Sequence, residues 1–508
     1  MHMDNANSRI AKNTIFLYVR LIFVMLISLY SVRLVMHSLG IEDYGIYNVV
    51  AGFVVMLGFF GTTMTTAYQR YYNFEIGKHG YEGITPVFNA AIKIQVIVSL
   101  LIVVVFESFG IWYINNVMSL PLDRLSDANI LFQLTLFTTI FTILAIPYQA
   151  VVISYEKLNV FAVVGIVDAG LKFIAALLIG CFDRHRLIGY GTTLLIFSIF
   201  INAYYCFYSH RFFKHIKIKS SVGREFIRPM LIFSGLTFLG GTANLGKTQG
   251  VNLLRNYFFG VIVNAANAIV THIYSAIQTF STNIVMAFRP QLTEAYASGN
   301  IQRSIMLMSL MSKAAYSLVF TVSVPIALKM EYILKLWLGK ELPDYTSQFT
   351  LLTLLIAVIG TLHTPINQMV NAVGNIKKFQ FFYSIILLLI LPVGWFGFKL
   401  GYAPESIFYI TIGAMVIIQI VSVYILSSLS TISVGFYFKT IISPCLLFSI
   451  CMPILPVTGT LYMKEDTILN LLLFFLLSII GAGLSCRTIL SNREYTSLKS
   501  VILRCFQK

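Results

Sequence analysis

The chain alternates between long apolar stretches and short polar segments from one end to the other. Each stretch holds about 20 or more mostly apolar residues, the length that an α-helix needs to cross roughly 30 Å of hydrocarbon. Strands of a membrane barrel would instead show about ten residues of strict alternation. The pattern predicts about fourteen transmembrane helices, at 14–39, 45–66, 86–108, 129–153, 159–181, 187–209, 227–252, 261–286, 303–328, 346–372, 379–400, 404–428, 438–457 and 468–488.

Composition agrees with this prediction, and the charge of the loops orients it. Of the 508 residues, 57% are apolar and only 11% are charged, against about 25% charged in soluble domains. With the N-terminus inside, 21 of the 36 Lys and Arg residues fall in inside segments and nine in outside segments. Because cytoplasmic loops are rich in Lys and Arg, we expect both termini in the cytoplasm. The net charge of +16 then reflects this bias and attraction to anionic membrane lipids, and no nucleic-acid partner is expected.

The chain also carries a weak internal repeat. Residues 40–62 resemble residues 260–282 at a shift of 220, and Pro147 falls on Pro365 at a shift of 218. The shift spans six predicted helices, and an even number means that both copies enter the membrane in the same direction. We therefore expect two parallel six-helix lobes around a cleft, followed by two further helices. The predicted parts are an N-lobe at 1–222, a C-lobe at 223–432, and a last helix pair with a cytoplasmic tail at 433–508.

Three segments resemble the Wzx-type polysaccharide flippases. They are 33–47 (RLVMHSLGIEDYGIY), 289–300 (RPQLTEAYASGN) and 367–378 (NQMVNAVGNIKK). With the plan of two lobes and two extra helices, the resemblance covers nearly the whole chain. These motifs are typical of a superfamily that also includes the MATE drug exporters and the lipid II flippases, and they specify the substrate poorly.

The resemblance implies a MATE-like, all-α fold in a bacterial inner membrane. It implies transfer of an undecaprenyl-diphosphate-linked oligosaccharide from the cytoplasmic to the periplasmic leaflet by alternating access. The driving force would be an ion gradient, of H⁺ or Na⁺, or the membrane potential, and polysaccharide assembly proteins are expected partners. No covalent chemistry, cofactor or metal is implied.

Charged residues within the predicted helices are the first candidates for a site, because a charge in a membrane usually faces a cavity or a partner. The basic candidates for substrate binding are Arg20, Arg33, Lys93, Lys172, Lys247 and Lys313 within the helices, and Arg255 just beyond the helix at 227–252. Acids are few, so cations without a partner dominate, which suits an anionic diphosphate–sugar headgroup. Side chains near helix ends can instead reach the interface. Asp168 precedes Lys172 by four residues, so it is either an ion-pair partner or an ion-coupling site.

Amide and hydroxyl side chains are the second set of candidates. Asn267 and Asn367 lead this set, and the others are Asn48, Thr62, Thr63, Thr66, Asn264, Thr271, His272, Gln278, His363, Gln368 and Asn371. Such groups suit the hydroxyls of a sugar, and they suit hydrogen bonds between helices equally well.

One motif is misleading. Residues 241–248 match the pattern of a phosphate-binding loop, but such a loop follows a buried strand, and this match lies inside a predicted spanning helix. The glycines there would allow close helix packing, and Lys247 would face the cleft. No arrangement typical of an enzyme occurs. The alternatives to a flippase are a MATE-type antiporter of cationic drugs, for which acids are scarce, and a glycan polymerase or ligase, for which no loop is long enough.

Overall fold

The fold is all-α and consists of long apolar helices. The computed structural model describes residues 2–55, 58–116, 124–182, 185–218, 223–338, 344–430, 432–463, 465–491 and 494. Of these residues 91% are helical, and none of them lies in a strand. The chain divides into two compact units, the first being Lys12–Phe238 and the second being Leu239–Lys508 together with Met1–Ala11. The boundary between the units thus lies sixteen residues after the position predicted from the sequence, inside a helix.

The helices of the first unit pack around α5. Its helices are α1 (His2–Val55), whose residues up to Ala11 belong to the second unit, α2 (Gly58–His79), α3 (Ile84–Val105), α4 (Ile111–Asn116), α5 (Leu125–Ser154), α6 (Leu158–Leu178) and α7 (Arg186–Phe212). Contacts of α5 with α7, α2 and α3 form the core, and α6 covers α7.

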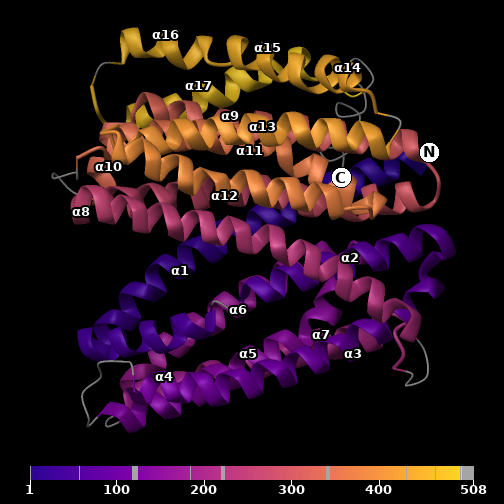
Figure 1. Cartoon of the computed structure of the whole chain (residues 1–508), viewed down its shortest axis with the longest axis vertical. Helices are drawn as coiled ribbons and strands as arrows, with labels where there is room; N and C mark the ends of the chain where they lie inside the picture. Colours follow the sequence, from indigo (N-terminus) through magenta and orange to yellow (C-terminus); the bar gives the residue numbers. More distant parts are fainter. Residues whose placement is uncertain are drawn as a thin grey trace. The chain divides into compact units, whose positions relative to one another are not determined.

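The second unit holds the remaining helices. They are α8 (Arg224–Ala297), which begins in the first unit, α9 (Ile301–Leu328), α10 (Met330–Leu338), α11 (Thr346–Val373), α12 (Lys377–Lys399), α13 (Ser406–Leu429), α14 (Val434–Tyr437), α15 (Ser443–Cys451), α16 (Ile454–Tyr462), α17 (Ile468–Leu484) and α18 (Cys486–Ile489). In this unit α11, α12 and α13 run alongside one another (Figure 1), with α13 in contact with both neighbours. The last helix pair, α15–α16 and α17, packs against α9.

The predicted internal repeat is visible in the order and packing of the helices. The helices α11, α12 and α13 begin 221, 219 and 220 residues after α5, α6 and α7. The pairs correspond in contacts as well, since α5 packs on α7 as α11 packs on α13, and α6 on α7 as α12 on α13. Both α5 and α11 contain their proline, Pro147 and Pro365, inside the helix.

Eleven stretches of the described residues are long and apolar enough to cross a membrane, and the shorter apolar helix α17 adds to them. The prediction was about fourteen helices. The predicted helix at 45–66 crosses residues 56–57, which lie outside the described residues, and the one at 261–286 is continuous with α8. The protein is therefore a polytopic membrane protein.

Glycine in left-handed conformation marks where two helices change direction. Gly40 has φ 82° and interrupts α1, and Gly374 has φ 90° and ends α11, with its N–H donating to the carbonyl of Val370 at 3.0 Å. Only glycine adopts this conformation without a steric penalty. The two positions thus fix the helix ends in the segments 33–47 and 367–378.

The long helix α8 folds back on itself. The Arg255 guanidinium donates to the side chain of Asn267, and Asn267 in turn donates to Asn252. Residues twelve to fifteen positions apart would be separated by about 18–22 Å in a straight helix. The two arms of α8 therefore lie against each other, with the turn between residues 255 and 267.

Candidate functional site

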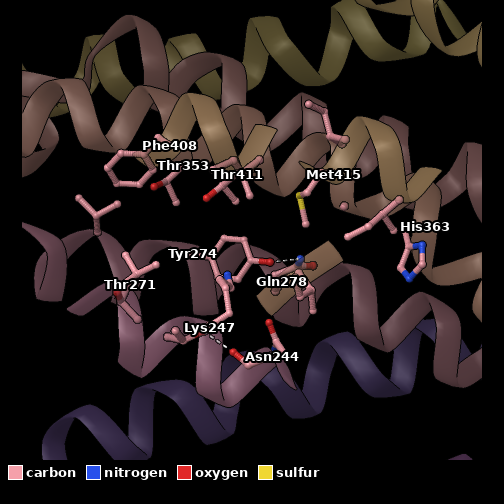
Figure 2. A pocket seen from close by; sticks show the side chains of 18 of the residues that line it. Asn244, Lys247, Thr271, Tyr274, Gln278, Thr353, His363, Phe408, Thr411 and Met415 are labelled. Carbon is pink, nitrogen blue, oxygen red and sulfur yellow. Dashed lines mark hydrogen bonds between the residues drawn. The ribbon is translucent and has the colours of Figure 1, made fainter. Parts of the chain in front are cut away.

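The second unit contains a cavity of about 330 Å³ between α8, α11, α12 and α13. Figure 2 shows Lys247 and Asn244 rising from α8 on one side, with Thr353, Thr411 and Met415 on the opposite side. All the lining residues belong to this unit. The polar ones are Asn244, Lys247, Thr248, Asn252, Arg255, Asn267, Thr271, Tyr274, Gln278, Thr353, His363, Thr364, Tyr383 and Thr411.

Helical spacing brings these side chains to one cavity. The first arm of α8 contributes positions 244, 247, 248, 251, 252 and 255, which recur every three or four residues and so share one face. The second arm contributes positions 267, 270, 271, 274 and 278 at the same spacing. Because polar residues alternate with valine along these faces, the cavity is amphipathic.

The charge of the cavity is entirely positive. Lys247 and Arg255 line it, and no Asp or Glu is found among the lining residues. Within the described part of the chain, the Lys247 ammonium has neither an ion pair nor a hydrogen bond. Such a cation in a membrane-spanning segment requires either water or an anionic ligand.

Arg255 is held rigidly by its surroundings. Its side chain is 2% exposed, and its guanidinium carbon lies 4.9 Å from the ring centre of Phe349 and 4.2 Å from that of Phe408. One guanidinium nitrogen donates to Asn267, while the Nε–H is buried with no acceptor. The predicted candidates Arg255 and Asn267 are thus brought together, and Lys247 lines the same cavity.

The remaining wall combines aromatic rings with hydrogen-bonding groups. The Gln278 amide donates to the Tyr274 hydroxyl at 2.8 Å. At one end of the cavity, set apart from the other labelled residues in Figure 2, His363 stacks on Phe379 and Tyr383 with ring centres 5.5 and 5.0 Å away. Flat apolar rings beside amides and hydroxyls suit a ligand that has both an apolar face and polar edges.

The candidates of the first unit form a different arrangement. The Lys172 ammonium donates to Asp168 at 2.7 Å, and the two side chains are 59% and 34% exposed. Arg20 is half-buried, with its guanidinium 4.6 Å from the ring centre of Phe161. The side chain of Arg20 crosses Gly165 so closely that a Cβ there would overlap it. These cations therefore have an acid and an aromatic ring beside them.

The other candidates are scattered. Lys313 is buried in an ion pair with Glu494 at 2.8 Å, with the side chains 2% and 8% exposed. Arg33 is exposed on α1 and Lys93 is half-buried on α3. Asn367 is half-buried on α11, and its amide oxygen has no hydrogen-bond partner.

Some residues of the cavity were not anticipated from the sequence, chiefly Asn244, Asn252, Tyr274 and Tyr383. The side chains of Asn48 and Asn264, which were anticipated, lie outside the described residues. The signal that would have identified Asn244 and Asn252 is their spacing from Lys247 and Arg255 on one helical face. Tyr383 has no such signal, because α12 is far from α8 in sequence.

The segment that mimics a phosphate-binding loop lies within α8, as its context predicted. A Cβ on Gly240 would overlap the side chain of Gln380, and one on Gly250 would lie 2.6 Å from Leu391. Both contacts are to α12, so these glycines let α8 and α12 approach closely. Lys247, within the motif, lines the cavity.

Solved structures of transporters have the same fold as this chain. A MATE protein in the straight conformation aligns with a TM-score of 0.71, at 14% identity, over 84% of this chain and 97% of that one. An outward-facing multidrug resistance MATE family transporter of the MOP superfamily aligns at 0.69, at 14% identity, over 83% and 97%. A MOP superfamily transporter from Pyrococcus furiosus, whose binding pocket is described as reversed in polarity and suggestive of a different function, aligns at 0.69, at 15% identity, over 83% and 96%.

No family model matches the sequence, and no curated protein matches it. The similarity is thus one of three-dimensional structure, and it establishes a MATE-like fold over most of the chain. At this level of identity the fold alone is shared, and the substrate has to be inferred from the site.

Proposed function

We propose that this chain is a transporter that flips an undecaprenyl-diphosphate-linked oligosaccharide from the cytoplasmic to the periplasmic leaflet of a bacterial inner membrane. The single observation that carries the proposal is the cavity of the second unit, where Lys247 and Arg255 have no acid among the lining residues. An anionic headgroup that leaves water needs cations to replace its hydration. Proteins of the same fold are transporters, which supports a transport function.

The lining of the cavity supports a sugar headgroup. Tyr274, Gln278 and Thr411 contribute hydroxyl and amide groups to the lining, and Tyr383 contributes an aromatic ring. About 330 Å³ is near the lower end of the range for small-molecule pockets. That volume suits a charged group with one or two sugar rings, so the polyprenyl tail would stay in the bilayer.

In the proposed cycle the headgroup enters from the cytoplasmic side, is held by Lys247, and is released on the other side after the two lobes rock. Asp168 is our candidate for the site that binds the coupling ion, H⁺ or Na⁺. Because its carboxylate is paired with Lys172, a coupling ion would have to compete with that ammonium. Both termini are expected in the cytoplasm, where polysaccharide assembly proteins would meet the chain.

The second candidate function is a MATE-type cation-coupled multidrug antiporter. It is favoured by the structural similarity to a multidrug resistance MATE family transporter. The cavity argues against it, since two positive charges repel a cationic drug. The MOP superfamily transporter from Pyrococcus furiosus, with its reversed pocket polarity, is a precedent for a different function on this fold.

The test of the proposal is to delete the gene in a strain whose surface glycan depends on it. We expect surface glycan to fall and the lipid-linked oligosaccharide to accumulate in the inner leaflet. Wild type and Lys247→Arg should restore the glycan, whereas Lys247→Met should not. Full restoration by Lys247→Met, or raised tolerance to cationic drugs on overexpression with no effect on the glycan, would overturn the proposal.

A further inference from the structure

The hydrogen-bond network beside Lys247 has only one possible direction. A guanidinium donates and cannot accept, so Asn267 must turn its amide oxygen to Arg255. The amide nitrogen of Asn267 then donates to the oxygen of Asn252. This chain of two bonds leaves the amide nitrogen of Asn252 as the free end of the network.

Three free groups of the cavity lining are donors. They are the Lys247 ammonium, the Nε–H of Arg255, which is buried with no acceptor, and the amide nitrogen of Asn252, for which the described residues provide no acceptor. All three residues line the cavity and lie on one face of the first arm of α8. No carboxylate of the cavity lining offsets the two charges.

From this polarity we infer that the cavity has a binding site for a small inorganic anion, such as a halide, at Lys247, Arg255 and Asn252. The Nε–H of Arg255 is a buried donor without an acceptor, which is costly in a membrane. A small anion supplies an acceptor without covalent change, and the half-buried donors Lys247 and Asn252 line the same cavity. The inference does not depend on the identity of the transported molecule. If the proposed function is also correct, the anion occupies the site between substrates, and the anionic headgroup displaces it.

The arrangement also assigns different parts to the two cations. Arg255 is fixed by two aromatic rings and by Asn267, so it sets the direction of the network and contributes a permanent charge. Lys247 has no partner within the described residues, and its flexible stem lets the ammonium follow the ligand. Lys247 thus determines how tightly the ligand binds. Asn252 makes the site selective for an anion over a cation, because its free group is a donor.

The test uses the full-length purified protein in detergent, with bromide as the probe. Sodium bromide is titrated against sodium gluconate at constant ionic strength, and the thermal unfolding midpoint and the bromide anomalous signal in crystals are recorded. We expect a saturable rise in the midpoint and an anomalous peak beside Lys247. Lys247→Met and Asn252→Asp should weaken the apparent affinity about tenfold or more, as expected for lost bonds to a charged ligand.

Two controls keep the result interpretable. Lys399→Gln removes an exposed cation that contacts Trp395 outside the cavity and should leave the bromide response unchanged. Asn252→Leu removes the donor without adding charge, so it separates the hydrogen bond from the repulsion in Asn252→Asp. Equal bromide responses in wild type and Lys247→Met, or no response to bromide in the wild type, would overturn the inference.

The outcome is separable from that of the proposed function. Bromide binding that needs Lys247, with surface glycan unaffected by Lys247→Met, would support the anion site and refute the flippase. Loss of surface glycan in Lys247→Met, with no bromide binding in the wild type, would support the flippase and refute the anion site.

Discussion

Two lysines, one in each unit, differ in their partners. In the first unit, Lys172 is paired with Asp168 at 2.7 Å. In the second unit, Lys247 lines a cavity whose lining residues include no acid, although Lys313 of the same unit is paired with Glu494.

The difference shows which features the two copies of the repeat share and which they do not. Both units use the same order of helices at nearly constant spacing, because helix length and packing faces suffice to build that order. Charge compensation is set by single side chains, and so it can differ between two copies of one architecture. We therefore expect substitutions of compensated cations to change stability and substitutions of uncompensated ones to change ligand binding.

The largest effect is expected for Lys313→Met, which provides a reference for a compensated cation. Lys313 and Glu494 are both buried and paired at 2.8 Å, and removing one partner of such a pair costs about 3–5 kcal/mol. Thermal unfolding in detergent should show this loss, while transport per folded molecule stays near wild type. The double variant Lys313→Met with Glu494→Leu should recover most of the stability, and no recovery would contradict the pairing as its cause.

Charge reversal at Lys247 should have the next largest effect, and on transport rather than stability. Lys247→Glu replaces attraction by repulsion, which amounts to several kcal/mol and so to at least about a 100-fold loss of transport. Lys399→Glu, at an exposed lysine outside the cavity, is the matched variant and should lose far less. Similar losses for the two variants, measured as surface glycan per folded protein, would show that the effect is not specific to the cavity.

A smaller effect is expected where Arg20 crosses α6. Gly165→Ala places a Cβ where the Arg20 side chain lies, so Arg20 should move from the ring of Phe161. Loss of that cation–π contact should cost about 1 kcal/mol, measured from the unfolding midpoint. In a double-mutant cycle, Arg20→Met should remove most of the effect of Gly165→Ala, and simple additivity would show that Arg20 is not its target.

The smallest effect is expected for Asp168→Asn. Because Lys172 is 59% exposed and Asp168 34% exposed, the pair should contribute less than about 1 kcal/mol to stability. If Asp168 is the coupling site, transport should lose its dependence on the ion gradient while the unfolding midpoint hardly changes. Unchanged coupling would restrict Asp168 to its role as the partner of Lys172.

Much of the fold follows from the sequence, because the relevant signals are local. Apolar stretches of about 20 residues predict spans, and the matched prolines Pro147 and Pro365 lie within corresponding helices, α5 and α11. The i,i+4 pair of Asp168 and Lys172 is likewise a local pattern, and the structure contains it. The helices expected at 227–252 and 261–286 correspond to the two arms of α8, which folds back on itself between them.

The site was less predictable, because its residues meet only in three dimensions. The sequence singled out Lys247, Arg255 and Asn267, but it placed Arg255 just beyond a helix, and the structure buries it against Phe349 and Phe408. Lys313 appeared to be an unpaired cation, since its partner Glu494 is 181 residues away. Contacts of this kind depend on packing between distant helices, and no local pattern reports them.

The back-folded helix α8 also bears on how the protein is made. Arg255 and its acceptor Asn267 lie on the two arms of one helical hairpin, so they are synthesised within seconds of each other and can enter the bilayer as a pair. An arginine inserted alone would face hydrocarbon with its hydrogen bonds unmade. A hairpin in which this hydrogen bond has already formed lowers the free-energy cost of inserting Arg255 into the membrane, before any later helix has been translated.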